Sequence, residues 1–316
     1  MSQNKEEYRV FCQRKQQLPI FLQDWWLDIA CNYRWEVALY KDKGGNIVGV
    51  LPYFLNSKWG LKVITMPVLT PYMGVWIDYP VNSTKLESKY RLEKKAVSEL
   101  IQQLPKVAYY AQRHPVTFKN HLSFHWQGYQ QTGFYTFILY KECLANAYAN
   151  FKSSVRNHIK RAENIVTITE TDDLALFYDL NKQSFQRQKM DIPYKLSFIK
   201  KLDEVLKTRN QRMIYLAEDQ NGEPHATIYL IWDGQTIYNL MIGANTKLRS
   251  SGAVQLLLWK GIQLATEKNL NFDFEGGMMP NIESVFQAFG GEMVGYHKIY
   301  RGGNKCLNLL REIIKK

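Results

Sequence analysis

Apolar and polar residues follow the same pattern at two widely separated places in the chain. The stretch VALYKDKGGNIVGVLPY covers residues 37–53, and IYLAEDQNGEPHATIYL covers residues 214–230. In each, an apolar run leads to an aspartate, a glycine follows three residues later, and a second run then alternates between apolar and polar positions. Asp42 to Gly45 and Asp219 to Gly222 supply residue types that tolerate a tight turn. Both stretches are therefore predicted to form β-hairpins.

The elements predicted after each hairpin also agree in their order. A further apolar segment follows (LKVITMPVL, residues 61–69, and TIYNLMIG, residues 236–243), and each leads to a helical pattern at residues 84–104 and 251–269. Hairpins with an aspartate and a glycine are common enough to match by chance, but the shared order favours two copies of one α/β unit. We therefore predict two domains, residues 1–145 and 146–316.

Composition and charge narrow the classes of partner. Of the 316 residues, 46% are hydrophobic, which supplies material for two cores and excludes a disordered chain. The net charge is +12, shared as +7 up to Ala145 and +5 after it, so no basic tail indicates a nucleic-acid-binding arm. The excess still favours anionic partners such as phosphates, nucleotides, RNA or an acidic membrane surface.

The cysteines and the N-terminal residues indicate a reducing compartment. Cys12, Cys31, Cys143 and Cys306 lie far apart and form neither a zinc motif nor a disulfide framework. The scattered histidines show no metal-ligand spacing either, so no metal is expected. The first residues lack the apolar run of a signal peptide, and no apolar run is long enough to span a membrane. We therefore expect a cytoplasmic protein without a transmembrane segment.

The most informative stretch is LRSSGAVQLLLWKGIQLATEKNLNFDFEGG, residues 248–277. It predicts a loop, a long apolar helix that lies on a sheet, and a short strand. The start of such a helix presents unpaired N–H groups and the positive end of the helix dipole. Five residues surround that start. Arg249 supplies a cation, Ser250 and Ser251 supply hydroxyls, Gly252 lets a ligand approach the backbone, and Ala253 is small. Together they predict a cradle for a pyrophosphate group.

The segment LRSSGAVQLLLW resembles the acyl-donor loop of the GNAT acyltransferase superfamily, in which R/Q-x-x-G-x-G/A precedes a long helix. Arg249 and Gly252 match that pattern, whereas Val254 stands where the family has glycine or alanine. Four segments of the second half occur in an order similar to that of the FemAB-like branch, which carries two GNAT-like domains in tandem. These segments are FKSSVRNHIKRAEN, NKQSFQRQ, residues 238–277 and IESVFQAFGGE. The resemblance covers nearly the whole chain, and residues 238–292 are its most specific part.

This resemblance implies a fold and an activity. The fold would be α/β, with two tandem GNAT-like domains, each a mixed, mostly antiparallel sheet flanked by helices. The activity would be transfer of an acyl or aminoacyl group to an amine. Because the first half has no counterpart of RSSG before its helix, the donor site is expected in the second domain.

Two residues are candidates for catalysis. In NFDFEGG, the two phenylalanines point to one face of the predicted strand, and Asp273 and Glu275 to the other. Glu275 is our candidate for the general base that removes a proton from the attacking amine; the alternative is that it braces the following loop. Tyr296 is a candidate for protonating the leaving thiolate, and packing is its alternative role.

Four residues are candidates for contacts with the acceptor. Arg187, in NKQSFQRQ, resembles a basic position near the substrate cleft of related sequences, and a plain surface role is the alternative. Lys152 and Arg156 lie with Lys160 on one face of a predicted helix, which either holds an anionic substrate or is a solvated face. Tyr72 stands near a predicted turn in LTPYMGVWI, where it forms an aromatic wall or packs in the core.

Three functional hypotheses remain open. The first is transfer from an acyl-CoA thioester, such as acetyl-CoA, to an amine by direct attack, without a covalent enzyme intermediate. The second keeps the fold but uses aminoacyl-tRNA as the donor and a peptidoglycan precursor as the acceptor, as in the Fem ligases that the chain resembles. The third is a non-catalytic relative that binds a ligand or a protein. The acceptor amine, the acyl chain length and the oligomeric state stay open.

Overall fold

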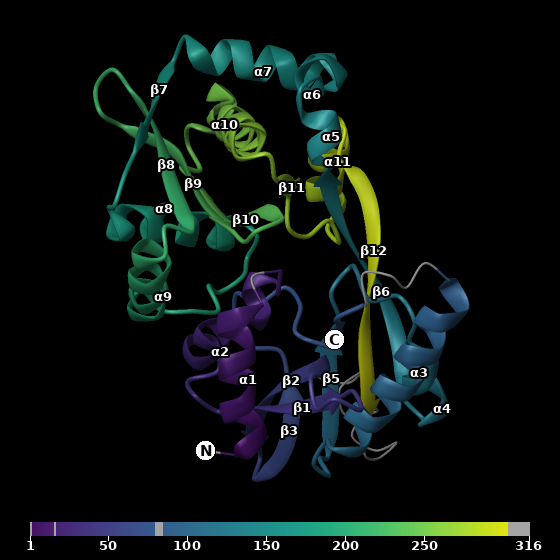
Figure 1. Cartoon of the computed structure of the whole chain (residues 1–316). Coiled ribbons are helices and arrows are strands. Elements are labelled where there is room, and N and C mark those ends of the chain that lie inside the picture. Colours follow the sequence, from purple (N-terminus) through teal and green to yellow (C-terminus); the bar gives the residue numbers. More distant parts are fainter. Residues whose placement is uncertain (1, 16, 80–84, 303–316) are drawn as a thin grey trace. The chain divides into compact units, whose positions relative to one another are not determined.

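The structure is a computed structural model that describes residues 2–15, 17–79 and 85–302. The chain groups into two compact units (Figure 1). Unit 1 comprises Met1–Phe134 and Gly295–Lys316, and unit 2 comprises Tyr135–Val294. This grouping differs from the expected division after Ala145, because the chain returns to unit 1 at Gly295. The boundary of independently folding domains stays a prediction.

The sheet of unit 1 is mixed and mostly antiparallel. Its strand order is β1-β2-β3-β5-β12, with β4 paired to β2, and among the described residues only the β3–β5 pair is parallel. The strands are β1 (Trp35–Lys41), β2 (Ile47–Lys58), β3 (Leu61–Thr65), β4 (Trp76–Ile77), β5 (Tyr109–Arg113) and β12 (Glu292–Gly302).

Helices cover both faces of this sheet. On one side lie α1 (Gln3–Arg14), the short 3-10 helix η1 (Ile20–Leu22) and α2 (Asp24–Ala30); on the other lie α3 (Leu86–Gln102) and α4 (Leu122–Trp126). The alternation along β1 decides which side chain goes where: Val37 and Leu39 pack with α1, whereas Ala38 and Tyr40 pack with α3.

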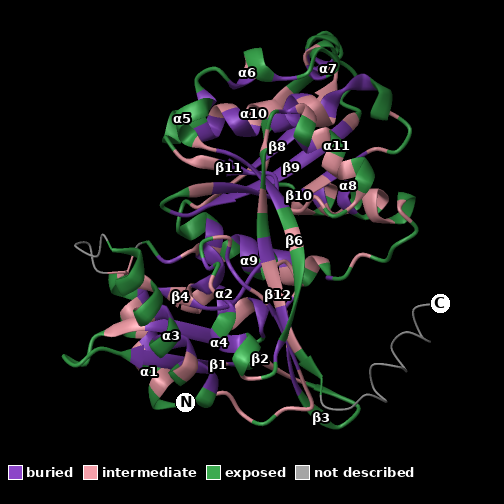
Figure 2. Cartoon of the chain, turned by 90° about the vertical axis from the view of Figure 1, so that its right-hand side faces the viewer, coloured by how far each residue is buried: buried purple, intermediate pink, exposed green. Residues whose placement is uncertain are grey.

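Unit 2 repeats this architecture with the strand order β6-β11-β10-β9-β8-β7. Of these pairs of described strands, β10–β11 is parallel and the others are antiparallel. The strands are β6 (Gln130–Leu139), β7 (Val166–Glu170), β8 (Arg212–Asp219), β9 (Pro224–Trp232), β10 (Thr236–Ala244) and β11 (Asn271–Asp273). The first five residues of β6, up to Phe134, belong to unit 1. β9 is buried along nearly its whole length and β8 in its middle, because helices lie on both faces (Figure 2).

The helices of unit 2 form two layers (Figure 1). On one face α7 (Ser153–Glu163) and α10 (Ala253–Lys268) pack with Ile228 and Leu230 of β9. On the other face lie α8 (Leu174–Arg187) and α9 (Leu196–Thr208). Four short helices complete the unit: α5 (Lys141–Leu144), α6 (Ala147–Asn150), η2 (Arg249–Ser251) and α11 (Pro280–Ala288).

The two predicted hairpins are present and share their turn chemistry. In each turn the aspartate Oδ1 accepts N–H bonds from the residues two and four positions later, at 2.8 and 2.9 Å for Asp42 and at 2.8 and 3.0 Å for Asp219. Gly45 and Gly222 have φ angles of +81° and +75°, a region that glycine favours. In each unit a helix then connects two parallel strands, so the predicted repeat and the predicted fold class are confirmed.

Candidate active site

The sheet of unit 2 opens where β10 and β11 separate. These parallel strands pair only from Thr236↔Asn271 to Tyr238↔Asp273, and β10 then continues to Ala244. The register of β10 against β9 shifts directly after that point, between Asn239 and Met241, as at a β-bulge. Over residues 239–244, one edge of β10 therefore has no pairing with β11 in the described part of the chain.

The motif NKQSFQRQ, residues 181–188, fixes the far end of β10. The Nδ2 of Asn181 donates to the carbonyl oxygen of Ile242 at 2.7 Å, and the Oγ of Ser184 accepts the N–H of Ala244 at 3.0 Å. Helix α8 also lies so close to the strand that a Cβ at Gly243 would be 2.6 Å from the backbone nitrogen of Asn181. This motif therefore positions the strand that leads into the loop before α10.

The N-terminus of α10 presents unpaired donors. Gly252 caps the helix with φ +84°, and the Oγ of Ser251 accepts the N–H of Ala253 at 3.3 Å. For the N–H groups of Val254 and Gln255, no hydrogen-bond partner is found among the described residues. Two first-turn donors and the helix dipole therefore remain for an anion.

The structure gives two of the predicted cradle residues a different role. A Cβ at Gly252 would lie 2.5 Å from the carbonyl oxygen of His158, so the backbone of α7 by itself requires a glycine at this position. Ser251 is buried and uses its hydroxyl as a helix cap. Arg249 and Ser250 are exposed, as a ligand contact requires.

Two arginines lie near each other beside this loop. Arg187 is exposed at the end of α8, and partial burial together with the positive charge of Arg249 lowers its pKa. Neither guanidinium forms an ion pair with an acidic side chain in the described ranges. Two neighbouring cations without a counter-ion repel each other, and an anion held by both would remove that repulsion. Arg187 and Arg249 are thus the two predicted residues that the structure brings together.

The two acids after β11 have different environments. Asp273 is buried; its Oδ1 accepts the hydroxyl of Thr136 at 2.5 Å and the N–H of Glu275 at 2.9 Å. Burial raises the pKa of Asp273 to about 6, against these two stabilising hydrogen bonds. Glu275 is half-buried and has φ +55°, an unfavourable region for a residue with a side chain. Asp273 thus holds Glu275 in place at the strand end, a role that the sequence did not reveal.

The other predicted contacts lie elsewhere. Tyr72 is buried in unit 1, with its ring 5.1 Å from that of Phe21, so it packs in the core. Tyr296 is also buried in unit 1, and its ring centroid is 5.8 Å from that of Phe134. Both burials oppose the predicted contact with a substrate, because an enclosed ring cannot reach one without rearrangement.

The predicted basic stripe on α7 is only partly available. The guanidinium of Arg156 donates to the carbonyl oxygens of Ala149 and Phe151, so it ties α6 and α7 together. Lys152 is exposed, and its N–H donates to the carbonyl oxygen of Ala288 at 2.8 Å. Of these two residues, only Lys152 keeps a charged group free of such backbone contacts.

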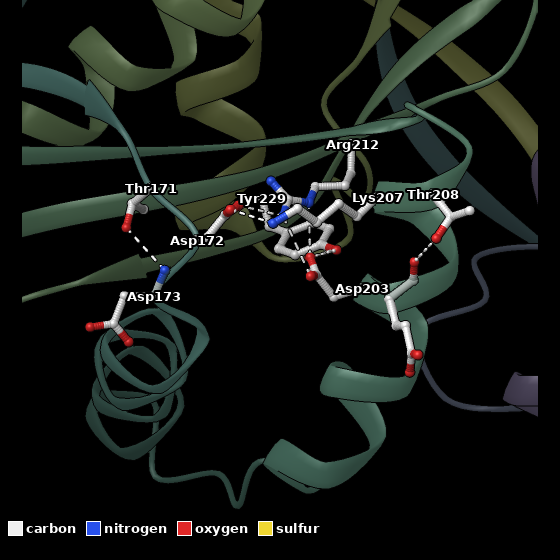
Figure 3. Close-up of polar contacts among 9 residues, drawn as sticks. Thr171, Asp172, Asp173, Asp203, Lys207, Thr208, Arg212 and Tyr229 are labelled. Carbon is white, nitrogen blue, oxygen red and sulfur yellow. Dashed lines mark hydrogen bonds and ion pairs between the residues drawn. The ribbon is translucent and has the colours of Figure 1, made fainter.

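A further cluster of charges in unit 2 was not anticipated (Figure 3). The Nε of Arg212 lies 3.0 Å from a carboxylate oxygen of Asp203. The carboxylate of Asp172 forms ion pairs with the guanidinium of Arg212 and with the ammonium group of Lys207, each at 2.5 Å. The hydroxyl of Tyr229 donates to Asp203 at 2.7 Å. Two carboxylates face two cations, so no net charge is left for a ligand. We assign this network to the attachment of α9 to the sheet.

In the described ranges, no group of three or more acids, histidines and cysteines could hold a metal ion. No helix there is both long and apolar enough to cross a bilayer. Cys12 and Cys31 are buried, and burial raises the pKa of Cys12 to about 12. Cys143 is exposed, and Cys306 lies outside the described residues.

Comparison with known proteins agrees with this geometry. Residues 149–280 match the family model described as Acetyltransferase (GNAT) domain. No curated protein sequence gives a match. FemX shares 12% identity and a TM-score of 0.63 over 94% of this chain and 96% of that one. L-PGS from Bacillus licheniformis shares 10% identity and a TM-score of 0.55 over 99% and 95%.

A third solved structure is a tandem GNAT protein from the clavulanic acid biosynthesis pathway. It is 10% identical, with a TM-score of 0.50 over 86% of this chain and 84% of that one. Identities this low show the fold alone, and that fold extends over most of this chain and of each of the three solved structures. The match to the family model identifies a GNAT acetyltransferase domain in residues 149–280, and the chain shares its fold with FemX and with a tandem GNAT protein.

Proposed function

We propose that this protein transfers an acyl group from an acyl-CoA thioester to an amine. One observation carries the proposal. The opening between β10 and β11 leads to a loop and helix start where two N–H groups have no hydrogen-bond partner and two arginines have no ion-pair partner among the described residues. A diphosphate needs such an arrangement of donors and cations. The extended arm of CoA would then lie along the open edge of β10.

The chain's own residues supply the remaining steps. The N–H groups of Val254 and Gln255, with Arg187 and Arg249, hold the diphosphate and thereby fix the thioester at the strand edge. A backbone N–H of that edge polarises the thioester carbonyl; removing such a donor costs about 3 kcal/mol of transition-state stabilisation in other enzymes. Glu275 takes the proton that the amine loses on attack. The C–S bond breaks as the C–N bond forms, and the thiolate leaves.

Calorimetric titration with CoA and acetyl-CoA tests the donor. The wild-type protein should bind both, and Arg187→Gln with Arg249→Gln should weaken binding about 30-fold, at about 1 kcal/mol for each lost contact. Arg161→Gln is the matched control, because Arg161 is an exposed arginine of the same unit on α7. Absence of binding at millimolar CoA, or an equal loss in the control, would refute the proposed donor.

Aminoacyl-tRNA is the second candidate donor. The supporting observation is that Lys152, Lys160 and Arg161 are all exposed along α7, where a phosphate backbone can reach them. The resemblance to the Fem ligases would then imply a peptidoglycan precursor as the acceptor. Binding of charged tRNA that weakens steeply with salt would support this donor, and indifference to tRNA at low salt would exclude it.

A further inference from the structure

Unit 1 contains a cavity that the proposed transfer does not use. Its volume is about 670 Å³, within the range of ligand-binding pockets. The walls come from α3, α4 with the loop before it, the start of β6 and the middle of β12. Ten residues line it: Tyr90, Lys94, Lys119, Asn120, His121, Leu122, His125, Trp126, Gln131 and His297.

The lining is cationic. Lys94 and Lys119 contribute two ammonium groups, and none of the ten residues is acidic. The neighbouring Glu93 does not line the cavity, and its carboxylate already accepts the hydroxyl of Tyr79 at 2.5 Å and the amide of Asn120 at 2.8 Å. Glu93 therefore anchors the wall and leaves the two lysines without an acidic partner inside the cavity.

The rim is apolar and aromatic. Tyr90, Leu122 and Trp126 are exposed by 54%, 53% and 58%, an unusual density of large apolar side chains at one place on a surface. The ammonium group of Lys94 lies 5.1 Å from the centroid of the Trp126 ring. The cation thus lies over the face of the ring, and a ligand that carries both an anionic group and a ring can contact the two together.

A pair of histidines, the buried His121 and the partly exposed His297, completes the inner wall. The Nε2 of His121 lies 3.0 Å from the Nδ1 of His297, and the Nδ1 of the buried His121 has no partner among the described residues. Burial and the charge of His297 lower the pKa of His121 to about 4, so this ring is neutral at pH 7. An unpaired buried N–H is rarer than an unpaired acceptor. His121 is therefore the donor to His297, whose Nε2–H is left for the cavity.

We propose that this cavity is a second binding site, for a small anion that carries a flat unsaturated ring. Lys94, Lys119 and the Nε2–H of His297 bind the anionic group, and the ring stacks on Trp126. The site lies wholly within unit 1 and is independent of the donor site proposed in unit 2.

Calorimetric titration of the full chain with 1-naphthyl phosphate tests this site, with inorganic phosphate as the probe that lacks a ring. Naphthyl phosphate should bind at least about tenfold more tightly than phosphate. The double variant Lys94→Gln with Lys119→Gln should bind naphthyl phosphate about tenfold more weakly than the wild-type protein does. Trp126→Leu should bind naphthyl phosphate no more tightly than it binds inorganic phosphate. Lys95→Gln is the matched control, since Lys95 is on the same helix but outside the cavity, 5.9 Å from the Tyr40 ring.

Three results would overturn the proposal. The first is no saturable binding of naphthyl phosphate at millimolar concentration. The second is a loss in the control equal to that in the double lysine variant. The third is equal affinity for the two probes in the wild-type protein. Circular dichroism of each variant separates a loss of binding from a loss of folding.

Discussion

The buried carboxyl of Asp273 predicts how the stability of unit 2 depends on pH. Its pKa is about 6 in the folded chain, against an ordinary value of 3.8. The difference of about two pH units corresponds to about 3 kcal/mol. Because the folded pKa is raised, the stabilisation is complete below pH 3.8 and is lost as the pH rises through 6. Ionised Asp273 therefore destabilises unit 2 at neutral pH.

Asp273→Asn should remove this penalty. The amide is uncharged at every pH, and its oxygen still accepts the N–H of Glu275 and the hydroxyl of Thr136. We expect the variant to match the wild-type protein near pH 4 and to exceed its stability by up to about 3 kcal/mol at pH 7.5.

Hydrogen exchange of peptides from β9 and α10, followed by mass spectrometry, measures this difference. It reports opening of unit 2 without assuming that the whole chain unfolds in one step. Asp219→Asn is a control of opposite sign, because the N–H of Glu223 lowers the pKa of Asp219 and its charge is stabilising at neutral pH. An effect of Asp273→Asn that is the same at both pH values, or a less stable variant at pH 7.5, would refute the reasoning.

Three further substitutions test other parts of unit 2. Tyr229→Phe should lower the stability of α9 by about 1.5–3 kcal/mol in hydrogen exchange, since it removes a hydrogen bond to the charged Asp203. Gly243→Ala should cost about 1–3 kcal/mol in thermal unfolding, because its Cβ would lie 2.6 Å from the nitrogen of Asn181. Glu275→Gln should lower kcat at least about 100-fold and leave the affinity for acyl-CoA unchanged in steady-state kinetics.

Each of these has a control. Tyr178→Phe removes a hydrogen bond to a neutral carbonyl, that of Tyr194, and should cost less than Tyr229→Phe. Gly133→Ala places a Cβ where no atom lies within 4 Å, so a loss similar to that of Gly243→Ala would contradict the steric argument. Unchanged turnover in Glu275→Gln would exclude this residue as the base while leaving the transferase assignment in place.

Local patterns predicted most of the fold. The alternation in residues 37–53 and 214–230 and the aspartate–glycine turns specified both hairpins, because strand periodicity and turn chemistry depend on neighbours in sequence. The loop before α10 and the motif at residues 181–188 were also recognisable. The structure adds why they occur together: side chains of that motif hold the end of β10.

The sequence by itself determined the repeat, the order of elements, and that Arg249 stands beside a helix start that follows a strand. Only the tertiary structure decided which side chains are available to a ligand, because burial depends on residues distant in sequence. It placed Arg187 near Arg249 and buried the rings of Tyr72 and Tyr296. It also placed the guanidinium of Arg156 against carbonyl oxygens and Gly252 against the backbone of His158. It likewise joined His121 to His297, whose proximity no periodicity along the chain encodes.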